Sequence, residues 1–195
     1  MINEVKDIRP IKTALRNAAL EWRKALTRSN KQRMDFKIQS KVMNLWKFRE
    51  VKTVLLYCSK PVEIDTKLII ERAMALGKTV AVPRCIPDTR DMDFYIIRSF
   101  SDLVSGAFGV MEPDPEKCEK LTDFEASVCI VPALVYDKEG YRLGYGKGYY
   151  DRFLSGYRGS CIGLAYSDWV KDSLPHGKFD RKVDIIVTEK ENYFC

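Results

Sequence analysis

The chain has 195 residues, of which 46% are hydrophobic and 31% are charged, and its net charge is +6. This composition suits one compact domain over residues 1–195 and excludes a disordered protein. The sequence has no secretory signal and no apolar run near the roughly 20 residues of a membrane span. Its six cysteines are scattered and it has a single histidine, which favours reduced thiols over disulfides or a zinc site. We therefore expect the protein in the cytoplasm.

The first predicted element is an amphipathic helix over residues 7–26, because its apolar residues recur at helical spacing. Pro10 fits its first turn, where a missing N–H group costs nothing. Lys12 and Arg16 lie four residues apart on a neighbouring strip, so one anion can contact both, although a solvated basic strip is the alternative interpretation. A second helix is predicted around residues 38–46.

An alternation of strands and helices follows. The pattern predicts a strand at 53–59, a helix that Asp65 or Thr66 caps and Gly77 ends, and a strand at 79–83. Further strands are predicted at 92–97, 127–137, 160–167 and 182–189, with a loop-rich stretch around 106–115 and a short helix at 149–157. Short apolar strands that alternate with helices predict a mainly parallel sheet covered on both faces. Ligands of such sheets bind beyond the carboxyl ends of the strands.

The segment RLGYGKGYYD, residues 142–151, follows the strand at 127–137 and begins the short helix. It is neither a Walker loop nor a dinucleotide fingerprint, because Tyr141 and Tyr149 stand where those motifs need glycine. Its three glycines still allow backbone N–H groups to approach an anion, beside the positive end of a helix dipole. The segment therefore predicts phosphate binding, with an ordinary tight turn as the alternative.

Side chains of the same segment strengthen this prediction. Arg142 and Lys147 add positive charges, and Asp151 offers a hard oxygen ligand for a magnesium ion shared with phosphates. The tyrosines at 145, 149 and 150 offer flat faces to an aromatic ligand.

RLGYGKGYYD resembles the signature of the 5-formyltetrahydrofolate cyclo-ligases, also called 5,10-methenyltetrahydrofolate synthetases. The resemblance runs nearly end to end, because shorter motifs fall in the family's order: IKTALR, SKPVEIDT, AVPR, GAFGVMEP and KVDIIVTE. One departure is Phe179-Asp180, where many members have a His-Asp pair, with His176 displaced. Another is Lys60, at a position that is often apolar in the family.

The resemblance implies a three-layer α/β/α fold with a mainly parallel sheet, like that of sugar-phosphate isomerases and CoA transferases. It also implies that ATP and Mg²⁺ drive closure of 5-formyltetrahydrofolate to 5,10-methenyltetrahydrofolate, with release of ADP and phosphate. The γ-phosphoryl group would activate the formyl oxygen for attack by N10 of the same folate, so the protein needs no nucleophile. The expected partners are these small molecules, with no nucleic acid and no membrane, and the expected state is a monomer.

Residue roles carry over by position from the resemblance. The residues implied to bind ATP are Lys12, Arg16, Arg142, Leu143, Gly144, Tyr145, Gly146, Lys147, Gly148, Tyr149 and Tyr150. The residues implied to bind the folate are Lys60, Glu63, Asp65, Phe108, Tyr145, Gly146, Lys147, Gly148 and Tyr149. The residues implied to hold Mg²⁺ are Asp151 and Asp184.

Alternatives remain for some of these roles. Asp65 can be a helix cap, Phe108 a core residue, and Asp184 a member of a surface ion pair. Lys12, Arg16 and the two cations of the 142–151 segment would repel one another around an empty cleft, and we expect Mg-ATP to relieve this strain.

Two other functions stay open. A different ATP-dependent enzyme on the same scaffold would keep the glycine segment but would bind ATP without folate. A nucleic-acid-binding module would use the positive net charge and the basic first helix, although a stacking motif and a strongly basic stripe are missing from the sequence.

Overall fold

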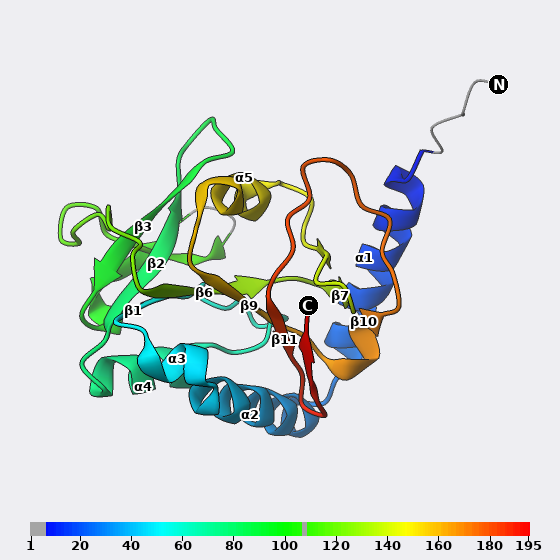
Figure 1. Ribbon diagram of the computed structural model, residues 1–195, viewed down its shortest axis with the longest axis horizontal. Helices are drawn as coiled ribbons and strands as arrows, with labels where there is room; N and C mark the ends of the chain where they lie inside the picture. The colour runs from blue at the N-terminus through cyan, green and yellow to red at the C-terminus, as the bar shows by residue number, and fades with distance from the viewer. Residues whose placement is uncertain (1–6, 107–108) are drawn as a thin grey trace.

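A seven-stranded sheet forms the centre of the computed structural model, which describes residues 7–106 and 109–195 (Figure 1). In spatial order its strands are β12 (Asn192–Phe194), β11 (Ile185–Val187), β9 (Ser160–Leu164), β6 (Ser127–Pro132), β1 (Thr53–Leu55), β2 (Thr79–Cys85) and β3 (Met92–Ile97). The inner strands from β11 to β2 run parallel, while the outer β12 and β3 pair antiparallel with their neighbours. The mainly parallel sheet is therefore confirmed.

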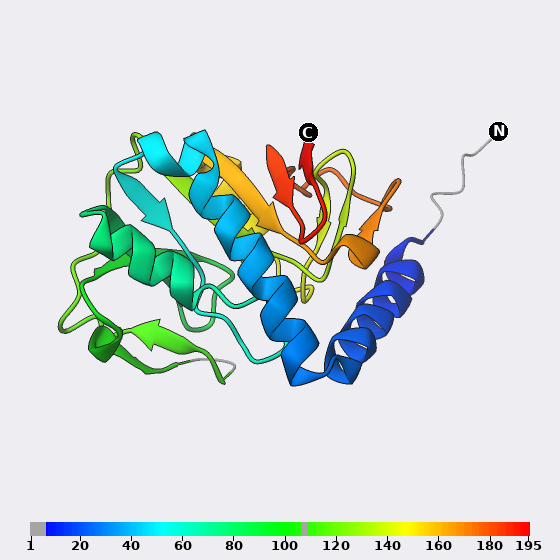
Figure 2. The ribbon, with the colours of Figure 1, turned by 90° about the horizontal axis from the view of Figure 1, so that it is seen from below.

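Helices cover both faces of this sheet. One face carries α2 (Arg28–Asn44), α3 (Trp46–Glu50) and α4 (Lys67–Ala75), and the other carries α5 (Tyr149–Gly156) (Figure 1). Figure 2 shows α2 crossing the strands, with α1 (Arg9–Ala25) beside it at one side of the molecule. The result is the three-layer α/β/α arrangement that the resemblance implies.

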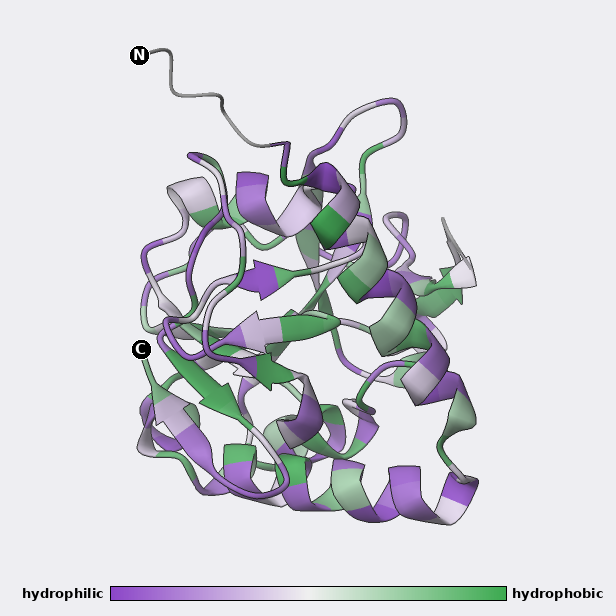
Figure 3. Ribbon diagram, turned by 90° about the vertical axis from the view of Figure 1, so that its right-hand side faces the viewer, coloured by the Kyte–Doolittle hydropathy of each residue, from purple (hydrophilic) through white to green (hydrophobic). Residues whose placement is uncertain are grey.

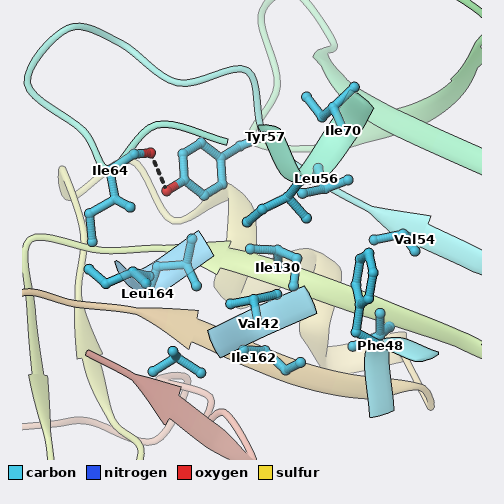
Figure 4. Close-up of a cluster of buried hydrophobic side chains, with 14 of the residues drawn as sticks. Val42, Phe48, Val54, Leu56, Tyr57, Ile64, Ile70, Ile130, Ile162 and Leu164 are labelled. Carbon is cyan, nitrogen blue, oxygen red and sulfur yellow. Dashed lines mark hydrogen bonds between the residues drawn. The ribbon is translucent and has the colours of Figure 1, made fainter. Parts of the chain in front are cut away.

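The alternation of side chains along each strand divides the core into two layers. In β6, Ile130 faces the layer of α2 to α4, while Cys129 and Val131 face α5. Figure 4 shows Val42 of α2 and Phe48 of α3 packed against strand residues of the first layer. Each such fully buried aliphatic or aromatic side chain contributes about 1.5–3 kcal/mol. Figure 3 shows hydrophobic colour gathered on the central strands and hydrophilic colour on much of the surrounding helices.

Local sequence explains where several helices begin and end. Pro10 lies in the first turn of α1, as predicted. At the start of α2, the hydroxyl of Thr27 accepts the N–H of Asn30 at 3.3 Å. Gly77, with a φ of 70°, follows the end of α4, where a left-handed residue closes a helix.

The strand predicted at 127–137 is wrong in its extent, because the chain leaves the main sheet after β6. β7 (Val135–Asp137) instead belongs to a second sheet with β8 (Arg142–Leu143) and β10 (Val170–Lys171). The buried Arg23 of α1 fixes this change of direction, since its Nη2 donates to the carbonyls of Ala133 and Leu134 at 2.8 and 3.2 Å. The break matters for function because it brings β8 and the glycine segment back over the edge of the main sheet.

Of the other predicted strands, β1, β9 and β11 are shorter than predicted, β3 has the predicted bounds and β2 extends to Cys85. β1 ends at Leu55, and beyond it the Tyr57 hydroxyl donates to the carbonyl of Ile64 at 2.9 Å (Figure 4). A hairpin of β4 (Leu103–Ser105) and β5 (Met111–Pro113) occupies part of the stretch that predicted only loop, and it packs against β2 and β3. Short 3₁₀ helices span Phe100–Asp102 and Ser167–Trp169. Among the described helices, none has the length and apolar character of a membrane span.

Candidate active site

The carboxyl ends of β6, β1 and β2 open into a cleft of about 440 Å³. Pro132 of β6, Cys58 beyond β1 and Pro83 of β2 line it, together with the glycine segment, one side of α1 and Asp180. This is the edge at which sheets of this kind bind ligands.

The glycine loop, residues 144–148, contributes backbone to this cleft. Gly146 and Gly148 have φ values of 88° and 79°, in the left-handed region where other residues are strained. Gly148 is the N-cap of α5, so the N–H groups of the first helical turn, which have no partner within the helix itself, lie at the cleft. The loop therefore has the geometry of an anion site at a helix start.

Two cations of α1 reach the same cleft. The Nε of Arg16 donates to the carbonyl of Gly144 at 2.8 Å. The Nζ of Lys12 lies 2.7 Å from Oδ2 of Asp180, and these two side chains are only 16% and 22% exposed. The expected repulsion among cations of the empty cleft is therefore wrong for Lys12, because a carboxylate already neutralises it.

Arg142 also has a carboxylate partner. Its side chain is 3% exposed, and its Nη2 donates to Oδ1 of Asp151 at 2.9 Å. Its Nη1 donates to the carbonyl of Arg181 at 2.7 Å, and the N–H of Arg181 in turn donates to Asp151 at 3.2 Å. Arg142 thus orients Asp151, while Lys147 is the exposed cation of the loop that lines the cleft.

The structure does not bring the two predicted metal ligands together. Asp151 lines the cleft, but Asp184 precedes β11 at the amino end of the strands. There its Oδ2 accepts the N–H of Cys161 at 2.7 Å and lies 3.7 Å from Nζ of Lys47. The assignment of Asp184 is corrected for this reason, and the second aspartate at the cleft is Asp180, four residues earlier.

Asp180 is held in its charged form. Burial opposes its ionisation, but hydrogen bonds from Lys12 Nζ and the N–H of Gly177 outweigh burial and keep the pKa of Asp180 below its usual value. In the described part of the chain, no three His, Cys, Asp or Glu side chains form a ready-made metal cage. Two carboxylates fit Mg²⁺ nonetheless, since this ion usually keeps waters and substrate phosphate oxygens as its other ligands.

Three of the predicted folate-binding residues, Lys60, Glu63 and Tyr145, meet at the cleft. Glu63 accepts the backbone N–H of Lys60 at 2.7 Å and a hydrogen bond from the Tyr145 hydroxyl. The Nζ of Lys60 lies 5.3 Å from the centre of the Tyr145 ring, in cation–π range. Burial raises the pKa of Glu63 and, with the neighbouring Glu63 charge, that of the Tyr145 hydroxyl.

Asp65 does not line the cleft. Its carboxylate accepts the N–H of Lys67 at 2.9 Å and the Ser59 hydroxyl at 3.2 Å, at the start of α4, which supports the helix-capping interpretation. Thr66 is the N-cap residue, but the capping side chain is that of Asp65, because the Thr66 hydroxyl donates to the carbonyl of Tyr57 at 2.6 Å. Phe108 lies outside the described residues.

Several residues of the cleft were not found from the sequence. Besides Asp180 they include Cys58, Cys85 and Glu112. Burial and the nearby Glu112 carboxylate raise the pKa of Cys58 to about 12 and also raise that of Cys85. Both thiols are therefore protonated at neutral pH and are poor nucleophiles. The signal that points to them is their place just after or at the end of a strand, in LYCS and VPRC.

A mainly parallel sheet with a glycine-rich helix start and paired cations at its carboxyl edge defines an α/β protein with the geometry of an anion site at that edge. Comparison of the sequence with known families gives the particular group. The model of the 5-formyltetrahydrofolate cyclo-ligase family matches residues 8–189, and the chain belongs to this family.

Individual relatives agree with this assignment. The chain is 30% identical over 179 residues to the 5-formyltetrahydrofolate cyclo-ligase of Haemophilus influenzae, covering 89% of this chain and 95% of the relative. The solved structure of Aquifex aeolicus 5,10-methenyltetrahydrofolate synthetase superposes with a TM-score of 0.83 at 34% identity, covering 94% of this chain and 92% of that one. For the Mycoplasma pneumoniae synthetase the TM-score is 0.73 at 27% identity, with 91% and 98% covered. The fold implied by the resemblance is thereby confirmed.

Proposed function

We propose that this protein catalyses the cyclisation of 5-formyltetrahydrofolate to 5,10-methenyltetrahydrofolate, with conversion of ATP to ADP and phosphate. The observation that carries the proposal is one cleft that joins a cationic glycine loop to an end lined by Lys60, Glu63 and apolar side chains. The names of the Haemophilus influenzae and Aquifex aeolicus relatives support the same reaction.

ATP would bind at the end of the cleft formed by the glycine loop and α1. Backbone N–H groups near Gly146 and Gly148 and the positive end of α5 attract phosphate oxygens. Lys147 and Lys12 add full charges on two sides of the cleft, and Arg16 holds the loop to α1 through Gly144.

Mg²⁺ would be held by Asp151 and Asp180, the two aspartates that line the cleft in the described part of the chain. Both are carboxylates fixed by hydrogen bonds, the donor type that this hard cation prefers. When bound, the ion neutralises phosphate charge during phosphoryl transfer.

The reaction needs activation of a poor leaving group. The formyl oxygen attacks the γ-phosphorus of ATP, the bond to the β–γ bridging oxygen breaks, and ADP leaves. N10 of the folate then attacks the activated formyl carbon and closes the five-membered ring. Phosphate departs with the former formyl oxygen and takes up the N10 proton. The protein's part is to position the two substrates and to neutralise charge, with Lys147 and the loop N–H groups at the transferred phosphoryl group.

The protonated thiols of the cleft agree with this division of labour. Because the pKa values of Cys58 and Cys85 are raised, neither thiol supplies a thiolate nucleophile at neutral pH. His176 does not line the cleft, and its ring stacks on Tyr141 with the ring centres 3.6 Å apart. In the proposed reaction the nucleophile is N10 of the substrate.

The test is an absorbance assay for 5,10-methenyltetrahydrofolate, run with and without ATP and Mg²⁺, together with measurement of ADP. The expected result is one ADP for each methenyl product and no product without ATP. Hydrolysis of ATP that does not depend on the folate would instead favour a different ATP-dependent enzyme on this scaffold.

A further inference from the structure

Glu112 of β5 is a buried carboxylate in the cleft that the proposed reaction has not used. Its side chain is 5% exposed and lines the end of the cleft beside β2, against which β5 packs. Its Oε1 accepts the N–H of Cys85 at 3.3 Å, a long hydrogen bond, and the Cys85 thiol also contacts it. Within residues 7–106 and 109–195, Glu112 has no cationic partner within 4.0 Å.

The backbone fixes the position of this carboxylate. A Cβ atom at Gly106 would lie 2.4 Å from Cγ and Oε2 of Glu112, so the absence of a side chain at 106 makes room for the carboxylate. Gly106 itself is held by the hydrogen bond from its N–H to the carbonyl of Val110 at 2.9 Å. The site is therefore built around a defined orientation of Glu112.

The other buried glutamate of the cleft differs in this respect. Glu63 accepts two strong hydrogen bonds, from the N–H of Lys60 at 2.7 Å and from the Tyr145 hydroxyl. The two donors that contact Glu112 are weaker, a long N–H bond and a thiol, so a ligand that supplies strong donors would offset the cost of burying this carboxylate. The buried hydroxyl of Tyr150, also at the cleft, has no hydrogen-bond partner among the described residues.

The surroundings of Glu112 select the kind of ligand. Pro83, Met92 and Val110 line the same end of the cleft, and apolar walls with a few fixed polar groups suit a flat heterocycle. The pterin ring of a folate presents its 2-amino group and N3–H side by side. Two parallel donors match the two oxygens of one carboxylate, whereas the neighbouring 4-oxo group would repel it.

We propose that Glu112 is a specificity-determining residue whose carboxylate accepts hydrogen bonds from the 2-amino group and N3–H of the pterin ring. This inference rests on the proposed function, because it names the part of the folate that the apolar end of the cleft holds. The residue acts in binding and has no part in phosphoryl transfer.

The experiment compares kcat/KM for 5-formyltetrahydrofolate and for its analogue without the 2-amino group, at saturating Mg-ATP. The wild-type protein is expected to prefer the parent folate by roughly 10- to 100-fold, the range of one hydrogen bond to a charged group. Glu112→Ala is expected to reduce this preference to within about threefold, with the KM for ATP changed less than about twofold, because the proposed pterin contact takes no part in binding ATP. Glu112→Gln keeps the volume of the side chain and is expected to lose most of the preference, since an amide offers one acceptor in place of two.

Glu116→Gln is the matched control, because it makes the same change at an exposed position four residues along, and it should keep the wild-type preference. The inference is overturned if the Glu112 variants prefer the parent folate as strongly as wild type, or if wild type shows no preference. Either result leaves the proposed function standing, because wild type would still form the methenyl product. Failure of wild type to form that product would remove the proposed function and this inference together.

Discussion

Replacing Arg16 with alanine removes the contact that joins α1 to the glycine loop. The Nε of Arg16 donates to the carbonyl of Gly144 at 2.8 Å, and its guanidinium carbon lies 3.3 Å from where a Cβ of Gly146 would be. A buried hydrogen bond to a charged group contributes about 1.5–3 kcal/mol, and the partial exposure of Arg16 reduces this to about 1 kcal/mol. We therefore expect Arg16→Ala to make local opening of residues 8–20 and 142–151 about fivefold more frequent without any ligand.

Amide hydrogen exchange measures this effect. In wild type, Mg-ATP at a hundredfold excess over its Kd should add about 2.7 kcal/mol of protection to both segments, and Arg16→Ala should weaken both protections together. Arg9→Ala is the control, because Arg9 lies on the same helix with its side chain 87% exposed and, among the described residues, pairs with its near neighbour Asp7. Protection by Mg-ATP that is confined to 142–151 would mean that α1 is not part of the nucleotide site.

Three further predictions concern charges at the cleft. Lys147→Ala should lower kcat/KM by roughly 10²- to 10³-fold, because it removes a charge at the proposed phosphate site. The Tm should stay unchanged, because the Lys147 side chain is exposed. Near-normal turnover would contradict that role. Asp151→Asn and Asp180→Asn should each raise the Mg²⁺ concentration needed for half-maximal rate. Asp184→Asn is the control and should not raise it, because Asp184 lies at the amino end of the strands. Mg²⁺ titrations of the first two variants that overlay wild type would refute the metal site. The pKa of Asp180 in the folded protein lies below its unfolded value, so its pairing with Lys12 stabilises the fold above about pH 4, and this stabilisation is lost as the pH falls through the folded-state pKa. Lys12→Met should therefore flatten the dependence of the unfolding free energy on pH below about 4. An unchanged slope would refute the pairing.

The spacing of apolar residues and the positions of the glycines predicted the helices and strands, and hence the layers of the fold, because both signals lie within a few neighbouring residues of the chain. The end of β6 was not predictable in this way, since it depends on Arg23, which is more than 100 positions away in sequence and binds the carbonyls of Ala133 and Leu134. The same limit explains the error over the second aspartate. Asp180 and Asp184 are four residues apart, and only the pairing of β11 with β9 shows which of them lies at the cleft.

The ion pairs of the cleft explain how so many cations lie together in it. Lys12 is paired with Asp180 and Arg142 with Asp151, so charges of both signs lie at the place where a triphosphate and a divalent cation would bind. A phosphate can take over a cation from its carboxylate, and the freed carboxylate can then bind the metal, so the number of close opposite-charge contacts is conserved. ATP without Mg²⁺ would leave these carboxylates facing phosphate oxygens, and like charges at this distance repel. Under the proposed function, the site is thus complementary to the metal–nucleotide complex and not to the free nucleotide.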